Sequence, residues 1–477
     1  MALIETQPST FGSYIALSYV WGCSQNFTTT SKTIEKMKSG VEVASLPNVF
    51  KDAVTLARRL GIRYIWIDAL CILQDSHEDW TIESTKMASL YEEAYLTIAA
   101  SSSTGCDDSF LRHKRDLLMT PISVDCTSIG GQKTTVKARL VTRTGIHEGT
   151  QHVRDPWDMR AWTLQEKLMS TRLVSYSGDE LQWFCKTLST CECGAALSRD
   201  TTRYPRSLSE IKDANNAYEF WQRQVMEYSR RFLTKPRDKL PAISGLARKI
   251  HNMTGSGYFA GLWLENILRD LCWKRDRLRR QWEPSWEVPS VDRSPTFSWA
   301  SVDGKVYYDF YLLHYDVTFE ATVITQSCKL SLKNEFDQFG EMESCSLEIR
   351  APVLSASLST TTDSAEKYRY TLNMNGRAIA FRADVWLEEF ILQDSVGCDS
   401  RSVRRSRCKD NPSFERVPVI VLFLGYYHYI STYRQFWLVL GKSRKSPPSF
   451  ERLGLLGTTS EEKPEHEESQ YSTVMLL

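Results

Sequence analysis

The sequence predicts an α/β amino-terminal domain built on a parallel sheet, followed by a helical region and a mostly β carboxyl-terminal region. Short apolar runs alternate with helix-period segments over the first 100 residues, and aromatic residues recur at helical spacing after residue 207. Strand-like apolar runs dominate from residue 295 onward. We therefore expect four parts: an α/β domain (1–200), a helical region (201–290), a β-rich region (291–457) and a disordered acidic tail (458–477).

The first strand of the predicted α/β domain covers residues 14–20, and its apolar run stops at Trp21 and Gly22. A helix follows over residues 46–60, because apolar positions recur there with a period of about 3.6 residues. Residues 64–67 form the second strand and are apolar at consecutive positions, as strands buried on both faces are. This strand–helix–strand order predicts that the two strands pair in parallel.

The second helix of this domain is expected to begin at Asp75-Ser76, since a serine side chain can cap the first turn and acidic residues follow it. Its buried face carries Met87 and Tyr91. Residues 95–100 then form the third strand. A second strand–helix–strand unit therefore extends the parallel sheet by one strand.

Beyond residue 200 the pattern changes from α/β to helical. Five residues are spaced alternately three and four apart, as on one face of a helix: Tyr218, Trp221, Val225, Tyr228 and Phe232. Two more helical stretches follow before residue 274. The acidic tail holds five glutamates and no core-forming pattern until Met475, which is why we expect it to be disordered.

Composition limits the classes of protein to which this chain can belong. It contains 42% hydrophobic and 25% charged residues, which is ordinary for a folded soluble protein. A net charge of +1 argues against nucleic acid or an anionic membrane as a partner, and no apolar run has the length of a membrane span. The amino terminus has no signal-peptide pattern, so we expect a cytoplasmic protein with mostly free thiols among its 12 cysteines.

Polar and aromatic residues follow the first two predicted strands, at the edge where parallel sheets hold ligands. Trp21 and Gly22 follow the first strand, and Asp68 and Gln74 follow the second. Asp68 either contributes a carboxylate to a ligand site or caps the turn after its strand. Trp21 either stacks on a ligand or belongs to the core, and Gly22 either admits close ligand approach or serves a tight turn.

Four segments together resemble a known family. They are Tyr14-Ile-Ala-Leu-Ser-Tyr-Val-Trp-Gly22, Trp66-Ile-Asp-Ala-Leu-Cys-Ile-Leu-Gln74, Met87 with Tyr91 and Ala94, and Arg160-Ala-Trp-Thr-Leu-Gln-Glu166. In this order and spacing they resemble the four motifs of the fungal heterokaryon-incompatibility (HET) domain. The resemblance implies a role in fungal non-self recognition that ends in programmed cell death, with self-association or another incompatibility protein as the partner.

The HET family is also thought to be distantly related to TIR domains, which have a flavodoxin-like sheet. Some TIR domains cleave NAD at the nicotinamide–ribose bond, so the resemblance implies NAD as a candidate substrate and no bound cofactor. Such a reaction has an oxocarbenium-like transition state that needs a nearby carboxylate. The candidate catalytic residues are Asp68 and Glu166, and the candidate ligand-binding residues are Tyr19, Trp21, Gly22, Gln74, Trp162 and Gln165.

Each candidate has a plainer alternative. Glu166 either contributes the second carboxylate or forms an ion pair with Arg160 or Lys167. A non-catalytic signalling module that acts through self-association explains the same motifs and stays open as the second hypothesis. No metal site is expected, because the spacing of the cysteines between residues 185 and 193 does not match zinc-binding knuckles.

Overall fold

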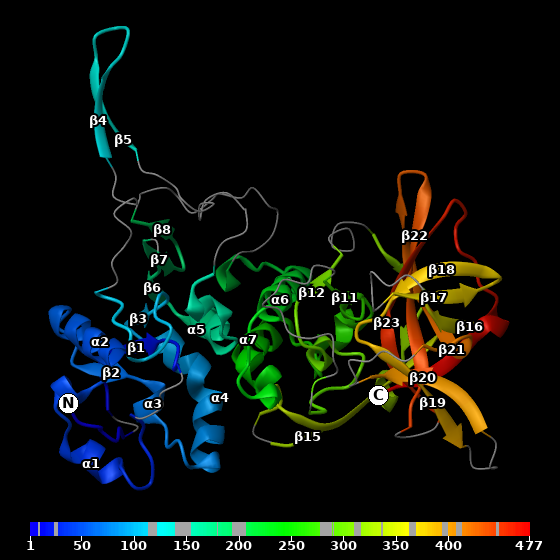
Figure 1. Cartoon of the computed structure of the whole chain (residues 1–477), viewed down its shortest axis with the longest axis horizontal. Helices are drawn as coiled ribbons and strands as arrows, with labels where there is room; N and C mark the ends of the chain where they lie inside the picture. The colour runs from blue at the N-terminus through cyan, green and yellow to red at the C-terminus, as the bar shows by residue number, and fades with distance from the viewer. Residues whose placement is uncertain are drawn as a thin grey trace. The chain divides into compact units, whose positions relative to one another are not determined.

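The structure is a computed structural model of the 477-residue chain. It describes residues 1–7, 10–22, 27–112, 122–138, 154–178, 180–192, 207–276, 289, 291–309, 316–334, 337–361, 369–393, 399–406, 413–444 and 448–477. The chain divides into two compact units, Met1–Glu210 and Ile211–Leu477 (Figure 1). The expected helical and β-rich regions thus lie together in the second unit.

A six-stranded sheet with the order β2-β1-β3-β6-β7-β8 organises the first unit. Its members are β1 (Tyr14–Ser18), β2 (Tyr64–Trp66), β3 (Leu96–Ala99), β6 (Arg172–Tyr176), β7 (Leu181–Cys185) and β8 (Ser189–Cys191). The first four in spatial order pair in parallel, whereas β7 and β8 are added antiparallel. The predicted α/β domain with a parallel sheet is therefore confirmed, although the sheet as a whole is mixed.

The helices of this unit are α1 (Ile34–Ser39), α2 (Asn48–Arg59), α3 (Asp68–Cys71), α4 (His77–Glu93) and α5 (Trp162–Met169). The sequence predicted two of them, α2 and α4. The long helix α2 falls within the predicted range 46–60. Ser76 is the N-cap of α4, where its side chain accepts a hydrogen bond from the amide of Asp79 at 3.2 Å.

Both faces of the parallel part of the sheet are covered, as its consecutive apolar residues require. One face presents Ile15, Leu17 and Ile98, which belong to the same core cluster as the apolar side of α2. The opposite face carries Trp66, whose ring meets the ring of Tyr91 in α4 edge to face, with centroids 5.7 Å apart. Helix α5 packs against α4 on this second face.

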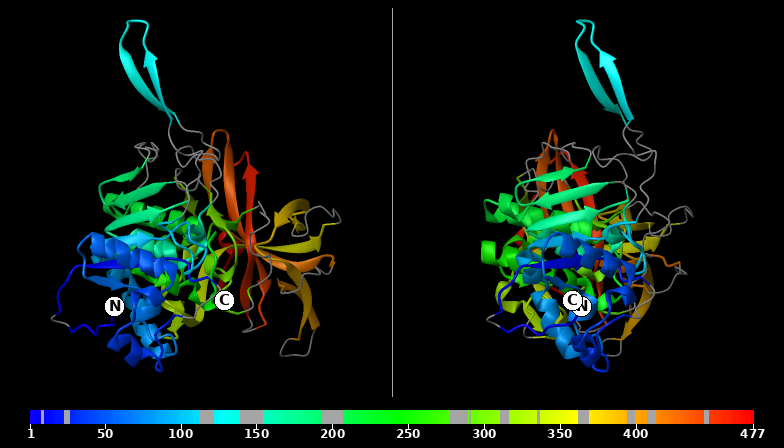
Figure 2. Two further views of the ribbon diagram at one scale, coloured as in Figure 1. Left: turned by 60° about the vertical axis from the view of Figure 1, so that its left-hand side comes forward. Right: turned by 90° about the vertical axis from the view of Figure 1, so that its left-hand side faces the viewer.

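A two-stranded hairpin, β4 (Ile122–Thr127) with β5 (Lys133–Ala138), lies between β3 and β6 along the chain (Figures 1 and 2). Its strands pair antiparallel with Val124 opposite Val136. The side chains of residues 122–127 and 131–136 are all exposed. The apolar residues among them are therefore not part of the core of the unit.

The second unit begins with helices and short strand pairs. They are α6 (Ala214–Tyr228), α7 (Ser244–Thr254), α8 (Ile267–Asp270), β9 (Tyr258–Phe259), β10 (Leu262–Trp263), β11 (Trp273–Arg275) and β12 (Val306–Tyr308). The predicted helix face is confirmed in α6, where Tyr218, Trp221, Val225 and Tyr228 are buried. Helix α6 ends at Tyr228, so Phe232 lies beyond the helix and is 36% exposed.

The rest of the second unit is mostly β, as predicted. Its ten-stranded sheet contains β13 (Thr318–Phe319), β14 (Thr322–Val323), β15 (Lys329–Leu332), β16 (Met342–Thr360), β17 (Arg369–Met374), β18 (Arg377–Arg382), β21 (Val417–Tyr429), β22 (Thr432–Lys442), β23 (Ser449–Ser460) and β24 (Tyr471–Leu476). The strands from β21 to β24 pair in sequence, and β16 pairs with both ends of this series, so the pairings close into a ring. β19 (Leu387–Gln393) and β20 (Asp399–Arg405) form a separate antiparallel pair.

The predicted disorder of residues 458–477 is wrong. β23 extends to Ser460, and β24 pairs with β16 and β23. Val474 and Leu476 of β24 are buried at 4% and 0% exposure. The glutamates that suggested disorder all precede β24, and the apolar residues after them alternate as in a strand with one buried face.

Candidate functional site

Most of the predicted site residues follow the ends of β1 and β2, and the other three, Trp162, Gln165 and Glu166, lie in α5. The chain runs from β1 to β2 on one side and then returns to β3 on the other side of β1. In a parallel sheet, such a reversal creates a crevice outside the carboxyl ends of the strands. Ser18 is the last residue of β1, and Asp68 begins the short helix α3 directly after β2.

Asp68 is held by hydrogen bonds from both strand ends. The indole Nε1 of Trp21 donates to its Oδ2 at 2.6 Å, and the amide of Ala69 donates to its Oδ1 at 2.7 Å. The Tyr19 hydroxyl is a further hydrogen-bond donor to this carboxylate. Burial raises the pKa of Asp68, and the positive charge of Arg160 and these hydrogen bonds act against the rise. Asp68 thus caps its own turn while it also faces two aromatic donors.

Glu166 lies in α5 and is 5% exposed. The Ser18 hydroxyl donates to its Oε2, and the indole Nε1 of Trp157 donates in turn to Ser18 Oγ at 2.5 Å. The Tyr91 hydroxyl of α4 also hydrogen-bonds to this carboxyl group. Burial raises the pKa of Glu166 to about 7, with the charge of Arg160 and the Ser18 bond acting against the rise. Both protonation states of Glu166 are therefore populated near neutral pH.

Arg160 connects the two carboxyl groups electrostatically. Its charge lowers the pKa of both Asp68 and Glu166, and the charge of Asp68 adds to the raised pKa of Glu166. The guanidinium Nη1 donates to the carbonyl oxygen of Tyr19 at 3.0 Å, and Cζ lies 5.7 Å from the centroid of the Trp21 ring. The structure therefore brings Asp68 and Glu166 into one charged cluster, which the sequence alone did not establish.

This cluster has an accessible outer layer and a buried inner layer. The outer layer consists of Trp21, Asp68 and Arg160, which are half-buried. The inner layer consists of four side chains that are at most 5% exposed: Ser18, Tyr91, Trp157 and Glu166. Asp68 is therefore the less buried of the two acidic residues, whereas Glu166 acts on the site through charge and hydrogen bonds.

The local backbone structure explains why glycine stands at position 22 and glutamine at position 74. Gly22 adopts a φ of +77°, and a Cβ atom there would lie 2.8 Å from the Cα of Gly105. The side-chain amide of Gln74 donates to the carbonyl oxygens of Asp68 at 3.1 Å and Ile72 at 3.0 Å, which closes the turn of α3. Both residues shape the loops that carry the cluster, and the geometry explains them without a ligand.

Trp162 and Gln165 lie in α5 together with Glu166. The Trp162 ring meets the ring of Trp80 in α4 edge to face, with centroids 6.3 Å apart. Gln165 is buried at 1% exposure, so a ligand does not reach it without movement of α5. Lys167, the alternative ion-pair partner of Glu166, instead places its Nζ 4.4 Å from the centroid of the Phe184 ring.

Sequence reasoning missed three members of the inner layer: Ser18, Tyr91 and Trp157. Ser18 and Tyr91 lie within two of the motifs, and this position was a signal of function. Ser18 also fits a buried strand, however, and Tyr91 also fits the buried face of a helix. Trp157 lies just before the fourth motif, where no periodicity set it apart. Arg160 was considered only as an ion-pair partner and is in fact the charge shared by both carboxyl groups.

The part of the chain that the structure describes contains neither a metal-binding group of side chains nor a helix of membrane-spanning character. No group of three or more His, Cys, Asp or Glu side chains is arranged there to hold a metal ion. Cys193 of the predicted cysteine cluster lies outside the described residues. Among the described helices, none combines the length and the apolar character needed to cross a membrane.

Comparison with known proteins gives one match. The family model described as Heterokaryon incompatibility protein (HET) matches residues 14–166, from the first residue of β1 to Glu166 in α5. The predicted resemblance is therefore confirmed for this segment. No curated protein and no solved structure matches the chain.

Proposed function

We propose that this protein, whose residues 14–166 form a HET domain, acts in fungal non-self recognition and triggers programmed cell death in the cytoplasm by cleaving NAD. A HET domain implies a function of the heterokaryon-incompatibility type. The observation that carries the proposed chemistry is the cluster of Asp68, Glu166 and Arg160 at the carboxyl ends of β1 and β2. An acidic residue that is half-buried, beside a second carboxyl group that is partly protonated, is an arrangement typical of reaction centres.

The proposed reaction consumes one NAD and one water molecule. The nicotinamide–ribose C–N bond breaks, and nicotinamide leaves with the bonding electron pair. The ribose carbon then carries positive charge, which we assign to the carboxylate of Asp68 for stabilisation because Asp68 is the less buried of the two acidic residues. Water adds to this carbon and forms ADP-ribose, and its proton passes to solvent.

Two neighbours of Asp68 suit the remaining parts of a dinucleotide. The guanidinium of Arg160 is half-buried and suits a diphosphate, and the ring of Trp21 is half-buried and suits stacking on a base. Glu166 is the positioning residue behind them, since its charge and the Ser18 bond act on the site without exposure. Because the pKa of Glu166 is about 7, the charge that it contributes to the site changes with pH near neutrality.

The sheet order supports the TIR-like reading at the level of fold. The spatial order β2-β1-β3-β6 corresponds to strand order 2-1-3-4, with which flavodoxin-like sheets begin. In such folds ligands bind at the reversal between the first and third strands. The end of β1, which carries Ser18, borders this reversal, whereas Asp68 follows β2 on the other side of β1. This is an analogy of fold, and the activity rests on the site residues.

The proposal is tested in a yeast host that expresses the full chain while growth and cellular NAD are followed. We expect growth arrest with NAD loss for the wild type, and neither effect for Asp68→Asn. Glu35→Gln is the matched control, because this carboxylate is exposed and lies outside the cluster. Growth arrest with unchanged NAD, in the wild type and in Asp68→Asn at equal protein levels, would exclude the enzyme.

A second candidate function is a non-catalytic module that signals through self-association, and the β4–β5 hairpin favours it. One face of this hairpin is apolar, with Ile122, Val124 and Val136 exposed at 65%, 45% and 48%. An exposed apolar sheet face on a two-stranded hairpin is not stable by itself and suits a partner. Among the described strands, β4 pairs with β5 alone, so its other edge is open.

A second copy of this chain fits the open edge of β4. Antiparallel pairing of two β4 strands about Val124 would place Ser123 opposite the partner's Asp125, and no like charges would face each other. Strand β5 is less suited, because it begins with Lys133 and lysines on an edge strand disfavour pairing with another chain. This candidate predicts that Val124→Glu abolishes both oligomers and growth arrest, whereas Gln132→Glu in the turn abolishes neither. Growth arrest that survives Val124→Glu would rule it out.

A further inference from the structure

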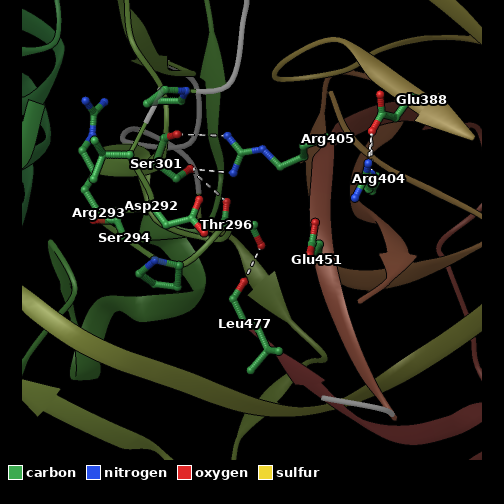
Figure 3. A pocket seen from close by; sticks show the side chains of 13 residues that line it. Asp292, Arg293, Ser294, Thr296, Ser301, Glu388, Arg404, Arg405, Glu451 and Leu477 are labelled. Carbon is green, nitrogen blue, oxygen red and sulfur yellow. Dashed lines mark hydrogen bonds and ion pairs between the residues drawn. The ribbon is translucent and has the colours of Figure 1, made fainter. Parts of the chain in front are cut away.

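The second unit contains a cavity of about 740 Å³ with many polar and charged residues in its lining, a volume typical of small-molecule sites. The lining comes from Pro289, the segment 291–301, the β19–β20 pair, Glu451 of β23 and Leu477. Figure 3 shows these parts around the cavity, with Arg405 directed toward Ser301. None of the residues around Asp68, Arg160 and Glu166, which we call the HET cluster, lines this cavity. Any ligand here is therefore independent of the proposed reaction.

Two of the three arginines that line the cavity are neutralised by neighbouring carboxylates. Arg404 donates through Nε to Glu388 Oε1 at 2.6 Å. Arg293 donates through Nη2 to Asp303 Oδ1 at 2.6 Å, and its Nε donates to the carbonyl oxygen of Ala300 at 2.8 Å. These two guanidinium groups are therefore part of the wall of the cavity and do not need a ligand.

Arg405 differs from the other two. Its Nη1 and Nη2 donate to the hydroxyl and carbonyl oxygens of Ser301 at 3.0 and 3.1 Å, whereas its buried Nε has no hydrogen-bond partner. Burial lowers the pKa of Arg405 to about 10, although the nearby charges of Asp384 and Glu451 act against this change. The guanidinium charge is thus incompletely compensated by the protein.

Ser294 provides a second unsatisfied group at the same cavity. Its Oγ is buried and has no hydrogen-bond partner among the described residues. A buried donor without an acceptor destabilises the protein by roughly the cost of removing it from water. Both missing partners have the same chemistry, since a hydroxyl and a guanidinium N–H each donate to an anionic oxygen.

We infer that this cavity binds a small molecule through a carboxylate or phosphate group that accepts hydrogen bonds from Arg405 and Ser294. The carboxylates of Asp292 and Glu451 line the same cavity and repel a polyanion. The ligand class is therefore a molecule with one anionic group and a polar or cationic remainder. Such a site gives the second unit a ligand of its own, separate from the substrate proposed for the HET domain.

The test measures binding of inorganic phosphate and of acetate to the full chain by thermal unfolding and calorimetry, at constant ionic strength. We expect at least one of the two anions to raise the melting temperature, and the more effective anion identifies the group. Ser294→Ala removes no hydrogen bond within the protein, so the unliganded variant should be as stable as the wild type. It should bind the effective anion about tenfold more weakly, since one hydrogen bond to a charged group is lost.

Two further variants keep the inference falsifiable. Arg405→Gln should abolish anion binding, and Arg377→Gln is the control, because Arg377 is an exposed arginine of β18 in the same unit. Stabilisation by neither anion would overturn the inference. Equal stabilisation of Ser294→Ala, Arg377→Gln and the wild type would also overturn it, because that result indicates a general salt effect. If Arg405→Gln does not fold, the response of Ser294→Ala decides.

Discussion

Buried charged groups occur in both units, but they have different surroundings. In the second unit, Asp270 is 0% exposed and has a pKa raised to about 7 by burial. Its Oδ1 accepts hydrogen bonds from the side chains of Gln222 at 2.6 Å and Asn266 at 2.8 Å, and its Oδ2 accepts one from the amide of Trp263 at 2.8 Å. Three neutral donors thus enclose this carboxyl group completely, so its perturbed pKa has a structural origin.

Arg452 of the same unit is equally enclosed. It is 0% exposed, and its nitrogens donate to Asp384 Oδ2 at 2.8 Å and to the carbonyl oxygens of Leu271 and Trp273 at 2.6 and 2.5 Å. Its Cζ also lies 3.7 Å from the centroid of the Trp273 ring. No face of this guanidinium is left for a ligand.

The HET cluster differs in exposure and in its arrangement of charge. Asp68 and Arg160 are half-buried, and the charge of Asp68 raises the cost of ionising Glu166. A raised pKa alone therefore does not identify a reaction centre, since Asp270 has one as well. The distinguishing property is a pair of perturbed carboxyl groups that influence each other's surroundings, one of them in a residue that is only half-buried.

The comparison predicts its largest effect on stability at Arg452. Replacement by methionine leaves Asp384 buried without its partner, so we expect a loss of about 3–5 kcal/mol in the free energy of unfolding. Denaturant unfolding measures it, with Arg377→Met as the exposed control. A loss below about 1 kcal/mol would show that this enclosed pair does not hold the second unit together.

The next largest effect is a pH dependence of stability that Glu166 causes. Its folded-state pKa is about 7 and its ordinary value is 4.5, so the folded chain binds this proton more tightly. The stability that this gives is fully present below about pH 4.5 and is lost as the pH rises through about 7. The difference between the two pKa values corresponds to on the order of 3 kcal/mol in the free energy of unfolding.

Glu166→Gln remains neutral and is expected to remove this dependence. The variant should match the wild type near pH 4.5 and be more stable above about pH 7, because no charge is then buried in α5. Urea unfolding of the two proteins across this range measures the effect. A wild type whose advantage over the variant grows as the pH rises would contradict the raised pKa.

A smaller effect is expected at Trp21. Phenylalanine keeps the ring but removes the Nε1 donor to Asp68, which should cost about 2 kcal/mol of stability, since a hydrogen bond to a charged group is lost. If the outer layer is a site, this variant should also lose most of its NAD cleavage. Trp80→Phe is the control, since Trp80 packs on Trp162 outside the cluster. Equal activity of the two variants would separate Trp21 from the chemistry.

The smallest effect concerns the helix that supports the inner layer. Ser76→Ala removes the side chain that accepts the Asp79 amide at the start of α4, and we expect a loss of about 1 kcal/mol. The cluster itself is untouched, so NAD cleavage should stay at the wild-type level. Reduced activity in this variant, measured where it is fully folded, would mean that α4 takes part in positioning the site.

Local patterns predicted the parts of the fold that depend on local periodicity. The helix over residues 46–60, the strands around residues 14–20 and 64–67, and the α6 face follow from apolar spacing alone. The antiparallel addition of β7 and β8 depends on long-range pairing that no local pattern specifies. The formation of β24 also depends on a segment distant in the sequence, because β16 pairs with it and supplies the surface that buries it.

The candidate site was predictable in its members but not in its connections. Asp68 and Glu166 stand out because a strand end and a motif carry them. Their proximity arises from the fold of η3 (Pro156–Met159) and α5 over the sheet, which places Arg160 next to both. Tertiary structure alone brings Asp68 and Glu166 close together, so their spacing in the sequence contains no information about their proximity.

The most direct test of the account measures nicotinamide released from NAD by the purified full chain, with the free energy of unfolding determined on the same samples. The wild type should release nicotinamide, and Asp68→Asn should reduce the rate by roughly 100-fold without a large loss of stability, because its pKa is already raised by burial. Release by the wild type and Asp68→Asn at equal rates, or no release by the wild type at high protein concentration, would contradict the account and leave Asp68 as a turn cap.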